Sequence, residues 1–278
     1  MAVNSPPPLA LTIAGSDSGG GAGIQADLKT FAALGVYGTS AITAITAQNT
    51  RGVTAVQEID LDIIAAQIDA VMQDIGADVV KTGMLSSAPI VRLVASKARE
   101  YGFGTFVVDP VMVAATGAKL LRDDAVQSIK SDLLPLATVV TPNIPEAQVL
   151  TGIEITSHDD MRDAAKLIHD MGVTHVVVKG GHLDSDSRST DLLFDGKDFT
   201  EFPGRRVHTT SNHGTGCTFA SAVAARMAYG RSVEEAVGEA KAFVSAAMAS
   251  AFPVGHGHGP LNHFHGWWQS YDGPRNGV

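Results

Sequence analysis

The sequence predicts a doubly wound α/β fold with a mostly parallel central sheet flanked by helices. First, short apolar runs that favour strands alternate with longer segments whose apolar residues recur at helical spacing, which is typical of βαβ units. Second, several of these runs end in a glycine-containing loop, as at 15–23 and at Gly83. Third, the chain has 278 residues, 45% of them hydrophobic, and can therefore bury a sizeable core.

The composition restricts the kinds of partner. The formal net charge of −9 argues against a surface for nucleic acid or an anionic membrane. No apolar run approaches the length of a membrane-spanning helix. The single cysteine, Cys217, excludes an internal disulfide and fits a reducing compartment. We expect a cytoplasmic protein that acts on a small molecule, with a flexible leader at 1–8 and a single domain at 9–278.

The first half of the chain supplies strands, helices and a flap. A strand-like run at 9–14 enters the glycine-rich loop at 15–23, and apolar residues at helical spacing follow at 24–34. Two β-rich segments, 37–47 and 53–59, surround a polar turn and predict a hairpin or small β flap. Further strands are predicted at 78–85 and 104–112, and further helices at 60–75 and 89–101.

The second half continues the alternation and ends in helices. Predicted helices lie at 123–134, 147–152, 158–171, 218–229 and 232–251. Predicted strands begin at 137, span 175–182, and form a surface hairpin from 191–194 and 198–202. The tail at 254–268 holds four histidines, but their spacing suits no helical metal-binding pair. We expect this tail to pack its aromatic residues onto the body of the protein.

Two segments near the N-terminus suggest contact with a polar ligand. The glycines at 15–23 do not follow the G-x-G-x-x-G spacing, and no Gly-Lys-Ser/Thr follows, which excludes a dinucleotide fingerprint and a P-loop. Asp17 and Asp27 could still face a ligand, although a lone aspartate such as Asp27 is usually a solvated helix carboxylate. Gln48, after the first flap strand, offers donors and an acceptor that suit an aminopyrimidine-like ring. The alternative is an ordinary polar turn.

Three charged residues stand at the carboxyl ends of predicted strands, where open parallel sheets bind their ligands. Asp109 and Glu146 follow neighbouring strands and together predict a magnesium–phosphate site. Lys179, which two glycines follow, is a candidate partner for nucleotide phosphates. The alternatives are an exposed carboxylate in an Asp-Pro turn at Asp109 and a surface lysine at a turn.

The most informative stretch is 211–218, where Gly214, Thr215, Gly216 and Cys217 precede a run of small and apolar residues. Glycine lets backbone approach a ligand, and a helix start supplies unpaired N–H groups with the positive end of the helix dipole. Together these form an anion hole without a basic side chain. The same field should lower the pKa of the Cys217 thiol. We interpret the stretch as a phosphoryl-transfer site, against a tight turn before a core helix with Cys217 as a small hydrophobe.

These motifs together resemble those of one family. They are Thr12-Ile13-Ala14-Gly15-Ser16-Asp17, Gln25-Ala26-Asp27-Leu28-Lys29, Ala47-Gln48-Asn49-Thr50-Arg51-Gly52, Lys81-Thr82-Gly83-Met84-Leu85, Thr141-Pro142-Asn143 with Glu146, Lys179-Gly180-Gly181-His182, and His213-Gly214-Thr215-Gly216-Cys217-Thr218. From about Leu9 to Trp268 the chain resembles the hydroxymethylpyrimidine/phosphomethylpyrimidine kinases of thiamine biosynthesis, in the ribokinase superfamily. The domain at 9–278 would then be one ribokinase-like kinase domain.

The resemblance implies ATP-dependent phosphorylation of 4-amino-5-hydroxymethyl-2-methylpyrimidine, and then of its monophosphate to the diphosphate. It implies that the pyrimidine contacts Gly15, Asp27, Gln48, Met84 and Val111. It implies that magnesium-ATP lies near Asp109, Asn143, Glu146 and Lys179, with Asp109 and Glu146 holding Mg²⁺ and Lys241 near the adenine. The amides of Gly214, Thr215, Gly216 and Cys217 would form the anion hole. A homodimer is implied by the family alone.

Cys217 departs from the wider superfamily, because sugar kinases of this fold usually have an aspartate base at that position. Cysteine there resembles the pyrimidine kinases and certain pyridoxal kinases, which disfavours an ordinary sugar kinase. The nearest alternative is a pyridoxine/pyridoxal kinase, since the B6 vitamers also carry a ring with a hydroxymethyl group. A non-catalytic pyrimidine-binding sensor would predict loss of the phosphate-side residues, which are present here.

Overall fold

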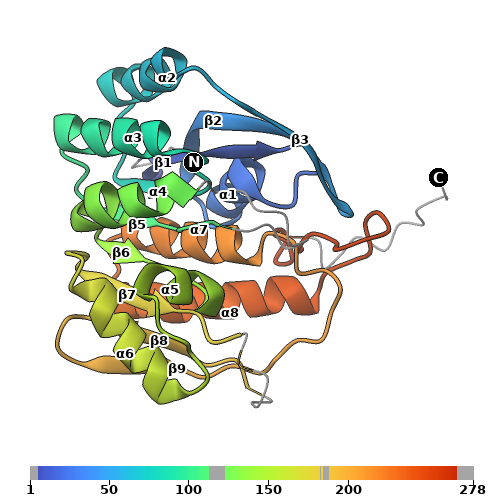
Figure 1. The fold of residues 1–278 in the computed structure, drawn as a ribbon. Helices are drawn as coiled ribbons and strands as arrows, with labels where there is room; N and C mark the ends of the chain where they lie inside the picture. Colours follow the sequence, from blue (N-terminus) through green and yellow to red (C-terminus); the bar gives the residue numbers. More distant parts are fainter. Residues whose placement is uncertain (1–5, 113–122, 182, 184–187, 268–278) are drawn as a thin grey trace, which may run out of the picture.

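Figure 1 shows a central sheet between two layers of helices in this computed structural model, which describes residues 6–112, 123–181, 183 and 188–267. The nine strands of the sheet are ordered β3-β2-β1-β4-β5-β6-β7-β8-β9. They are β1 (Leu9–Asp17), β2 (Tyr37–Asn49), β3 (Gly52–Glu58), β4 (Val79–Thr82), β5 (Phe106–Val108), β6 (Val139–Val140), β7 (His175–Val178), β8 (Asp191–Phe194) and β9 (Phe199–Phe202). From β2 to β7 neighbouring strands are parallel, and β3, β8 and β9 pair antiparallel. The doubly wound, mostly parallel sheet is confirmed.

The helices lie where the sequence predicts them, with one correction. They are α1 (Gly23–Ala33), α2 (Leu61–Asp74), α3 (Ala88–Tyr101), α4 (Asp123–Ser128), α5 (Ile144–Thr151), α6 (His158–His169), α7 (Thr215–Ala228) and α8 (Val233–Ala249). A single helix at 123–134 is wrong, because α4 passes into a π-helical turn at Ile129–Leu133 and a 3-10 turn at Leu134–Leu136. Pro135 stands in the 3-10 turn, where its missing N–H and its ring oppose further α-helix.

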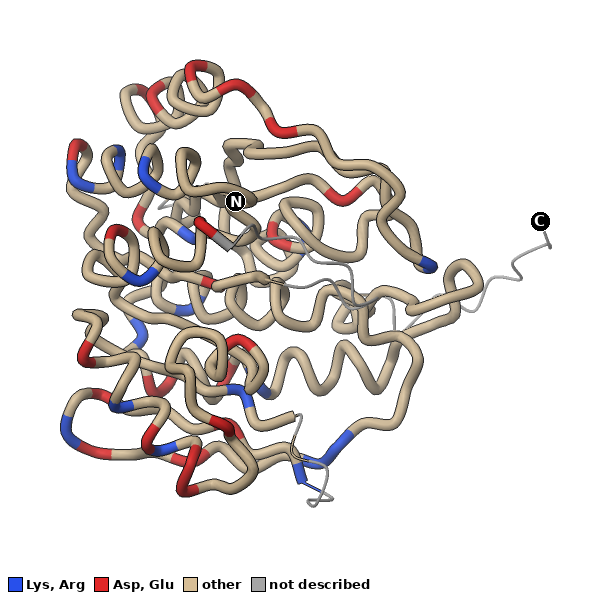
Figure 2. The backbone as a smooth tube through the Cα atoms, in the orientation of Figure 1, with Lys and Arg blue, Asp and Glu red and all other residues tan. Residues whose placement is uncertain are grey.

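Both faces of the sheet are buried along its central parallel strands, as the apolar character of these strands predicts, whereas the edge strand β3 is mostly exposed. Alternate residues of the strands face opposite layers, so that Phe106 and Val108 pack with α2 to α6, whereas Val107 packs with α1, α7 and α8. The acidic and basic residues of the described chain are interspersed along the outer helices and loops (Figure 2). In the described residues no helix is long and apolar enough to cross a membrane.

The hairpin of β2 and β3 is the predicted flap, and the C-terminal tail contacts its tip. The backbone N–H of His258 donates to the carbonyl of Thr50 at 2.7 Å. Within the described chain the tail forms no metal-binding group of three or more ligands. The expectation that its aromatic residues pack onto the body is wrong for Trp267, which is 73% exposed, and Trp268 lies outside the described residues. Of the predicted leader, residues 1–5 also lie outside them.

Candidate active site

A cleft of about 1280 Å³ lies beyond the carboxyl ends of the parallel strands, where the loops after β1, β4, β5, β6 and β7 meet the start of α7. Every residue that the sequence analysis assigns to the site lines this cleft, except Asp27. The lining residues among them are Gly15, Gln48, Met84, Asp109, Val111, Asn143, Glu146, Lys179, Gly214, Thr215, Gly216, Cys217 and Lys241. Residues more than 200 positions apart in the chain are thus brought to one place by the sheet topology.

The start of α7 forms a sharp turn that only glycine allows. Gly214 has a φ of +82°, and a Cβ there would collide with the carbonyl oxygen of Gly21. The Thr215 hydroxyl donates to the carbonyl of Asn212 at 2.7 Å and holds the turn from the other side. The N–H groups of the first helical turn have no intrahelical acceptor. The turn therefore presents backbone donors and the positive end of the helix dipole to the cleft.

Cys217 is half-buried in this turn, and its acidity differs from the sequence-based expectation. Burial raises the pKa of the Cys217 thiol to about 12; the positive charge of Lys81 opposes the rise, and the charges of Asp109 and Asp27 add to it. The prediction of a lowered pKa is thus wrong, because the helix dipole acts at a site that is both desolvated and close to carboxylates. At neutral pH the side chain is a thiol.

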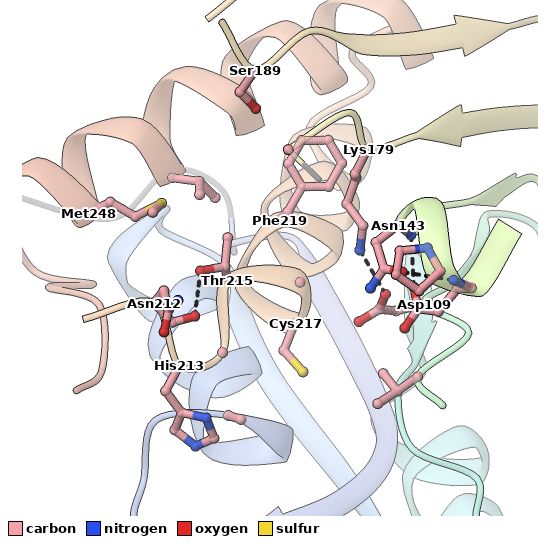
Figure 3. A pocket seen from close by; sticks show the side chains of 18 of the residues that line it. Asp109, Asn143, Lys179, Ser189, Asn212, His213, Thr215, Cys217, Phe219 and Met248 are labelled. Atoms are coloured by element: carbon pink, nitrogen blue, oxygen red, sulfur yellow. Dashed lines mark hydrogen bonds and ion pairs between the residues drawn. The ribbon is translucent and has the colours of Figure 1, made fainter. Parts of the chain in front are cut away.

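Lys179 and Asp109 form an ion pair on the side of Cys217 that faces away from His213 (Figure 3), with Nζ of Lys179 3.3 Å from Oδ1 of Asp109. Burial alone would lower the pKa of Lys179, but the charges of Asp109 and Glu146 outweigh it and raise the pKa. The ammonium is therefore charged. A Cβ on Gly216 would lie 3.3 Å from Lys179 Nζ. The lysine thus stands directly over the backbone of the turn, where an anion would meet both.

Glu146 lies in the first turn of α5 and closes a capping box. Its side chain accepts from the backbone N–H of Asn143 at 2.8 Å, and the Asn143 side chain accepts from the N–H of Glu146 at 2.9 Å. Burial raises the pKa of Glu146 to about 7; the charge of Lys179 opposes the rise and that of Asp109 supports it. Of this carboxylate pair, Asp109 also has a buried oxygen, Oδ2, without a hydrogen-bond partner in the described chain.

Lys241 reaches the cleft from α8, but its ammonium is already occupied. Nζ lies 2.7 Å from the Asp191 carboxylate and donates to the carbonyl of Ser189 at 2.6 Å. The apolar side chains of Phe219, Val244 and Met248 line the same end of the cleft and were missed by the sequence analysis. These three residues lie in helical segments of small apolar residues that are typical of a protein core, so the sequence did not indicate that they line a cleft.

The other end of the cleft is formed by the loop after β1 and by the flap. Gly15 packs against Met84 so closely that a Cβ would collide with the methionine methyl group. Gln48 comes from β2, and its backbone N–H donates to the Ser18 hydroxyl oxygen at 2.8 Å. Val111 follows β5 and lines the same cleft. These four predicted residues are brought together in one cleft.

Asp27 does not belong to this surface, and its predicted contact with a ligand is corrected. The side chain is fully buried and forms an ion pair with Lys81 at 2.9 Å, with both side chains 0% exposed. The hydroxyls of Thr12 and Ser221 donate to the same carboxylate at 2.6 and 2.7 Å. Asp27 therefore ties β1, β4 and α7 together beneath the cleft, and its complete burial keeps its carboxylate away from a ligand in the cleft.

The structure adds His213 to the site and pairs it with Asp17. His213 Nε2 lies 2.8 Å from Asp17 Oδ2, and both residues line the cleft. The sequence suggests Asp17 as a possible ligand contact but gives no role to His213. Its position directly before the glycine turn was the available signal. Figure 3 shows His213 on the opposite side of Cys217 from Asp109 and Lys179.

Comparison with known proteins finds kinases of two kinds. Residues 17–262 match the family model for phosphomethylpyrimidine kinase. The hydroxymethylpyrimidine/phosphomethylpyrimidine kinase of Bacillus subtilis is 52% identical over 255 residues, with 92% of this chain and 94% of that protein covered. The thiamine biosynthesis bifunctional protein ThiED of Geobacter sulfurreducens is 53% identical over 253 residues, with 91% and 51% covered. The pyridoxal kinase from Staphylococcus aureus, solved with AMP-PCP and pyridoxal, has a TM-score of 0.86, 39% identity and coverages of 94% and 95%.

Proposed function

The chain belongs to the phosphomethylpyrimidine kinase family, and on that premise we propose how its cleft works. The protein is an ATP-dependent kinase of thiamine biosynthesis. It phosphorylates 4-amino-5-hydroxymethyl-2-methylpyrimidine, and then converts the monophosphate to the diphosphate. The observation that carries the proposal is the convergence of Lys179, Asp109 and the glycine turn at Cys217 on one point of the cleft.

We assign the two ends of the cleft to the two substrates. The pyrimidine occupies the end at Gly15, Gln48, Met84 and Val111, with its hydroxymethyl group toward Cys217. The nucleotide occupies the end at Asn143, Lys179 and Lys241. The N–H groups of Gly214 to Cys217 donate hydrogen bonds to the phosphoryl group during its transfer. The Lys179 ammonium balances the negative charge of that group from the opposite side. Phosphoryl transfer depends mainly on such alignment and charge neutralisation, so a site built from backbone donors and one lysine suits it.

The carboxylates of Asp109 and Glu146 would hold Mg²⁺. The pair fits this ion, because Mg²⁺ is usually bound through one or two carboxylates together with substrate phosphates. The unpartnered Oδ2 of Asp109 is a buried acceptor that a cation would satisfy. When bound, Mg²⁺ would neutralise charge on the phosphates. Lys179, paired with Asp109 Oδ1, keeps the carboxylate turned toward the turn at Gly216.

Binding of Mg²⁺·AMP-PCP is expected to release a proton from Glu146. A glutamate with a pKa of about 7 is half protonated at neutral pH, and the ion binds only its ionised form. The apparent affinity should therefore weaken as the pH falls below 7, by up to about tenfold per pH unit. Calorimetry in buffers of different ionisation enthalpy measures the released proton. Glu146→Gln should remove this pH dependence; proton release that survives in Glu146→Gln assigns it to another group.

Cys217→Ala is expected to slow the first phosphorylation by about 10²–10⁴-fold, the usual contribution of a general base, and the second by less than about tenfold. The first acceptor is a hydroxyl whose proton passes to the small fraction of Cys217 that is thiolate, whereas the second acceptor is an already ionised phosphate oxygen. Because the pKa of Cys217 is raised to about 12, the thiolate fraction, and with it the first rate, should rise between pH 7 and 9. Single-turnover rates for the two substrates provide the measurement.

Cys217→Ser nearly keeps the size of the side chain and serves as the matched control, since a hydroxyl ionises far less readily than a thiol and offers even less of the anionic base. It should lose the first step nearly as fully as the alanine variant. Equal losses in both steps, or a first step independent of pH in the wild type, would contradict the role of Cys217 as a base.

The proposed function is tested by ADP release from purified protein with ATP and magnesium. Hydroxymethylpyrimidine, its monophosphate and pyridoxal are offered separately, since similar solved structures are pyridoxal kinases. Turnover of both pyrimidines with weak turnover of pyridoxal is the expected result. Pyridoxal turnover alone would assign the protein to B6 salvage, and pyrimidine binding without ADP release would identify a sensor.

Two further proposals concern the whole chain. We propose a homodimer, for which the exposed apolar residues Ile45 and Val56 of the flap give support, being 52% and 49% exposed. Sedimentation equilibrium that shows a monomer would reject it. We also propose that residues 9–278 form one domain, which requires a single cooperative unfolding transition. The cytoplasmic location stays a prediction of the sequence.

A further inference from the structure

Asp17, His213 and Gln48 form one hydrogen-bonded chain at the substrate end of the cleft. His213 Nε2 lies 2.8 Å from Asp17 Oδ2 and 3.2 Å from one terminal atom of the Gln48 amide. The other terminal atom lies 3.1 Å from the Thr46 hydroxyl oxygen. The side chains of Asp17 and His213 are buried, and Gln48 faces the cleft. The nitrogen and the oxygen of the amide differ in what they can bind, so its orientation decides which ring edge the site can read.

The partners of His213 fix the hydrogen on its Nε2. An ionised carboxylate can only accept hydrogen bonds, and Asp17 Oδ2 also accepts from the N–H groups of Gly21 and Ala22 at 3.0 and 2.8 Å. Burial alone would raise the pKa of Asp17, but the hydrogen bonds from His213 and Ala22 help to hold it below its ordinary value. His213 Nε2 therefore carries a hydrogen, donates it to Asp17, and has no lone pair to offer Gln48.

Thr46 gives the same answer from the other end of the amide. Its hydroxyl oxygen lies 2.8 Å from the carbonyl of Ser16, which can only accept, so the one hydroxyl hydrogen points there. Only lone pairs remain for Gln48, and these require an N–H. The structure has Nε2 of Gln48 facing His213 and Oε1 facing Thr46, but both hydrogen-bond arguments require the amide to be turned over, with Oε1 toward His213 and Nε2 toward Thr46. The reverse orientation would need a second hydrogen on Thr46 and a lone pair on His213 Nε2.

We propose that His213, held by Asp17, is a positioning residue that fixes the Gln48 amide and thereby selects an aminopyrimidine edge. The inference rests on the proposed contact of Gln48 with the substrate. Oε1 then accepts from the exocyclic amino group on the His213 side, and Nε2 donates to the neighbouring ring nitrogen on the Thr46 side. A ring with an oxo group and an N–H at these positions presents the reverse order, which leaves polar groups unpaired.

The test compares 4-amino-5-hydroxymethyl-2-methylpyrimidine with its 4-oxo analogue in the wild type, His213→Leu and His213→Gln. The wild type should prefer the amino substrate by about 100-fold or more in kcat/KM, because mispaired polar groups discriminate strongly. In His213→Leu the Gln48 amide can turn, and the preference should fall by about tenfold or more, mainly through KM. His213→Gln should restore it, since its amide N–H can replace Nε2–H against Asp17.

Each outcome decides the proposal. If His213→Leu loses activity on both substrates equally, His213 only supports the loop and the inference is overturned. If His213→Gln loses the preference as fully as His213→Leu, an N–H against Asp17 is not what orients the Gln48 amide, and the inference is again overturned. A wild type that is inactive on the amino substrate overturns the proposed function and the inference together. The two outcomes above overturn the inference alone, so the two failures can be told apart.

A second measurement uses the wild type alone. The ¹⁵N signals of the His213 ring, assigned from backbone connectivity, should show a hydrogen on Nε2 near neutral pH. This readout does not depend on the folding of any variant. A ring with an unprotonated Nε2 could accept from the Gln48 amide in the opposite orientation, and would overturn the inference.

Discussion

Gly214→Ala is expected to lower kcat by about 10²–10³-fold, which is the loss typical of removing or misplacing one oxyanion-type donor. An alanine Cβ would collide with the carbonyl oxygen of Gly21, and the φ of +82° is unfavourable for any residue with a Cβ. The turn must then move, and the N–H groups of Thr215 to Cys217 move with it. Steady-state kinetics with saturating ATP measure the loss, and circular dichroism shows whether the fold is kept.

Gly230→Ala is the matched control. Gly230 also has a positive φ, +77°, but its Cβ would meet nothing within 4 Å, and it follows α7 away from the cleft. The left-handed conformation should cost about 1–2 kcal/mol of stability, with kcat unchanged. If Gly214→Ala keeps the wild-type kcat, or if Gly230→Ala loses as much activity, the turn is not the anion hole.

Lys81→Met is expected to destabilise the fold by about 3–5 kcal/mol, the cost of leaving one partner of a buried ion pair uncompensated. Asp27 would keep its hydrogen bonds from Thr12 and Ser221 but lose the charge that balances it at 2.9 Å. Urea unfolding at neutral pH, followed by fluorescence and by circular dichroism, measures the change in the unfolding midpoint.

Two comparisons test the cause of this loss. Lys81→Met combined with Asp27→Leu removes both charges and should recover part of the stability, because no unpaired charge remains buried. Lys197→Met removes an exposed lysine, whose pair with Asp198 has side chains 87% and 74% exposed, and should leave the midpoint unchanged. A single Lys81→Met variant as stable as the wild type would show that the buried pair contributes little.

Local sequence patterns determined most of the fold. The alternation of apolar runs with helical spacing places the strands and helices, because backbone periodicity is a local property. Glycine at 214 and the Asn143 to Glu146 capping box could likewise be located from the sequence, since a sharp turn and a helix start need particular residue types at fixed offsets. The carboxyl ends of parallel strands then predict that Asp109, Glu146 and Lys179 lie together.

Only the tertiary structure decided what surrounds each of these side chains. Asp27 has the spacing of a solvated helix residue or a ligand contact, yet Lys81, 54 positions away, lies against it in the core. The acidity of Cys217 depends on burial and on carboxylates from other elements, and it reverses the expectation from the helix dipole. The contact between His213 and Asp17 spans 196 positions. Burial, charge and hydrogen-bond partners act through space, and sequence spacing does not record them.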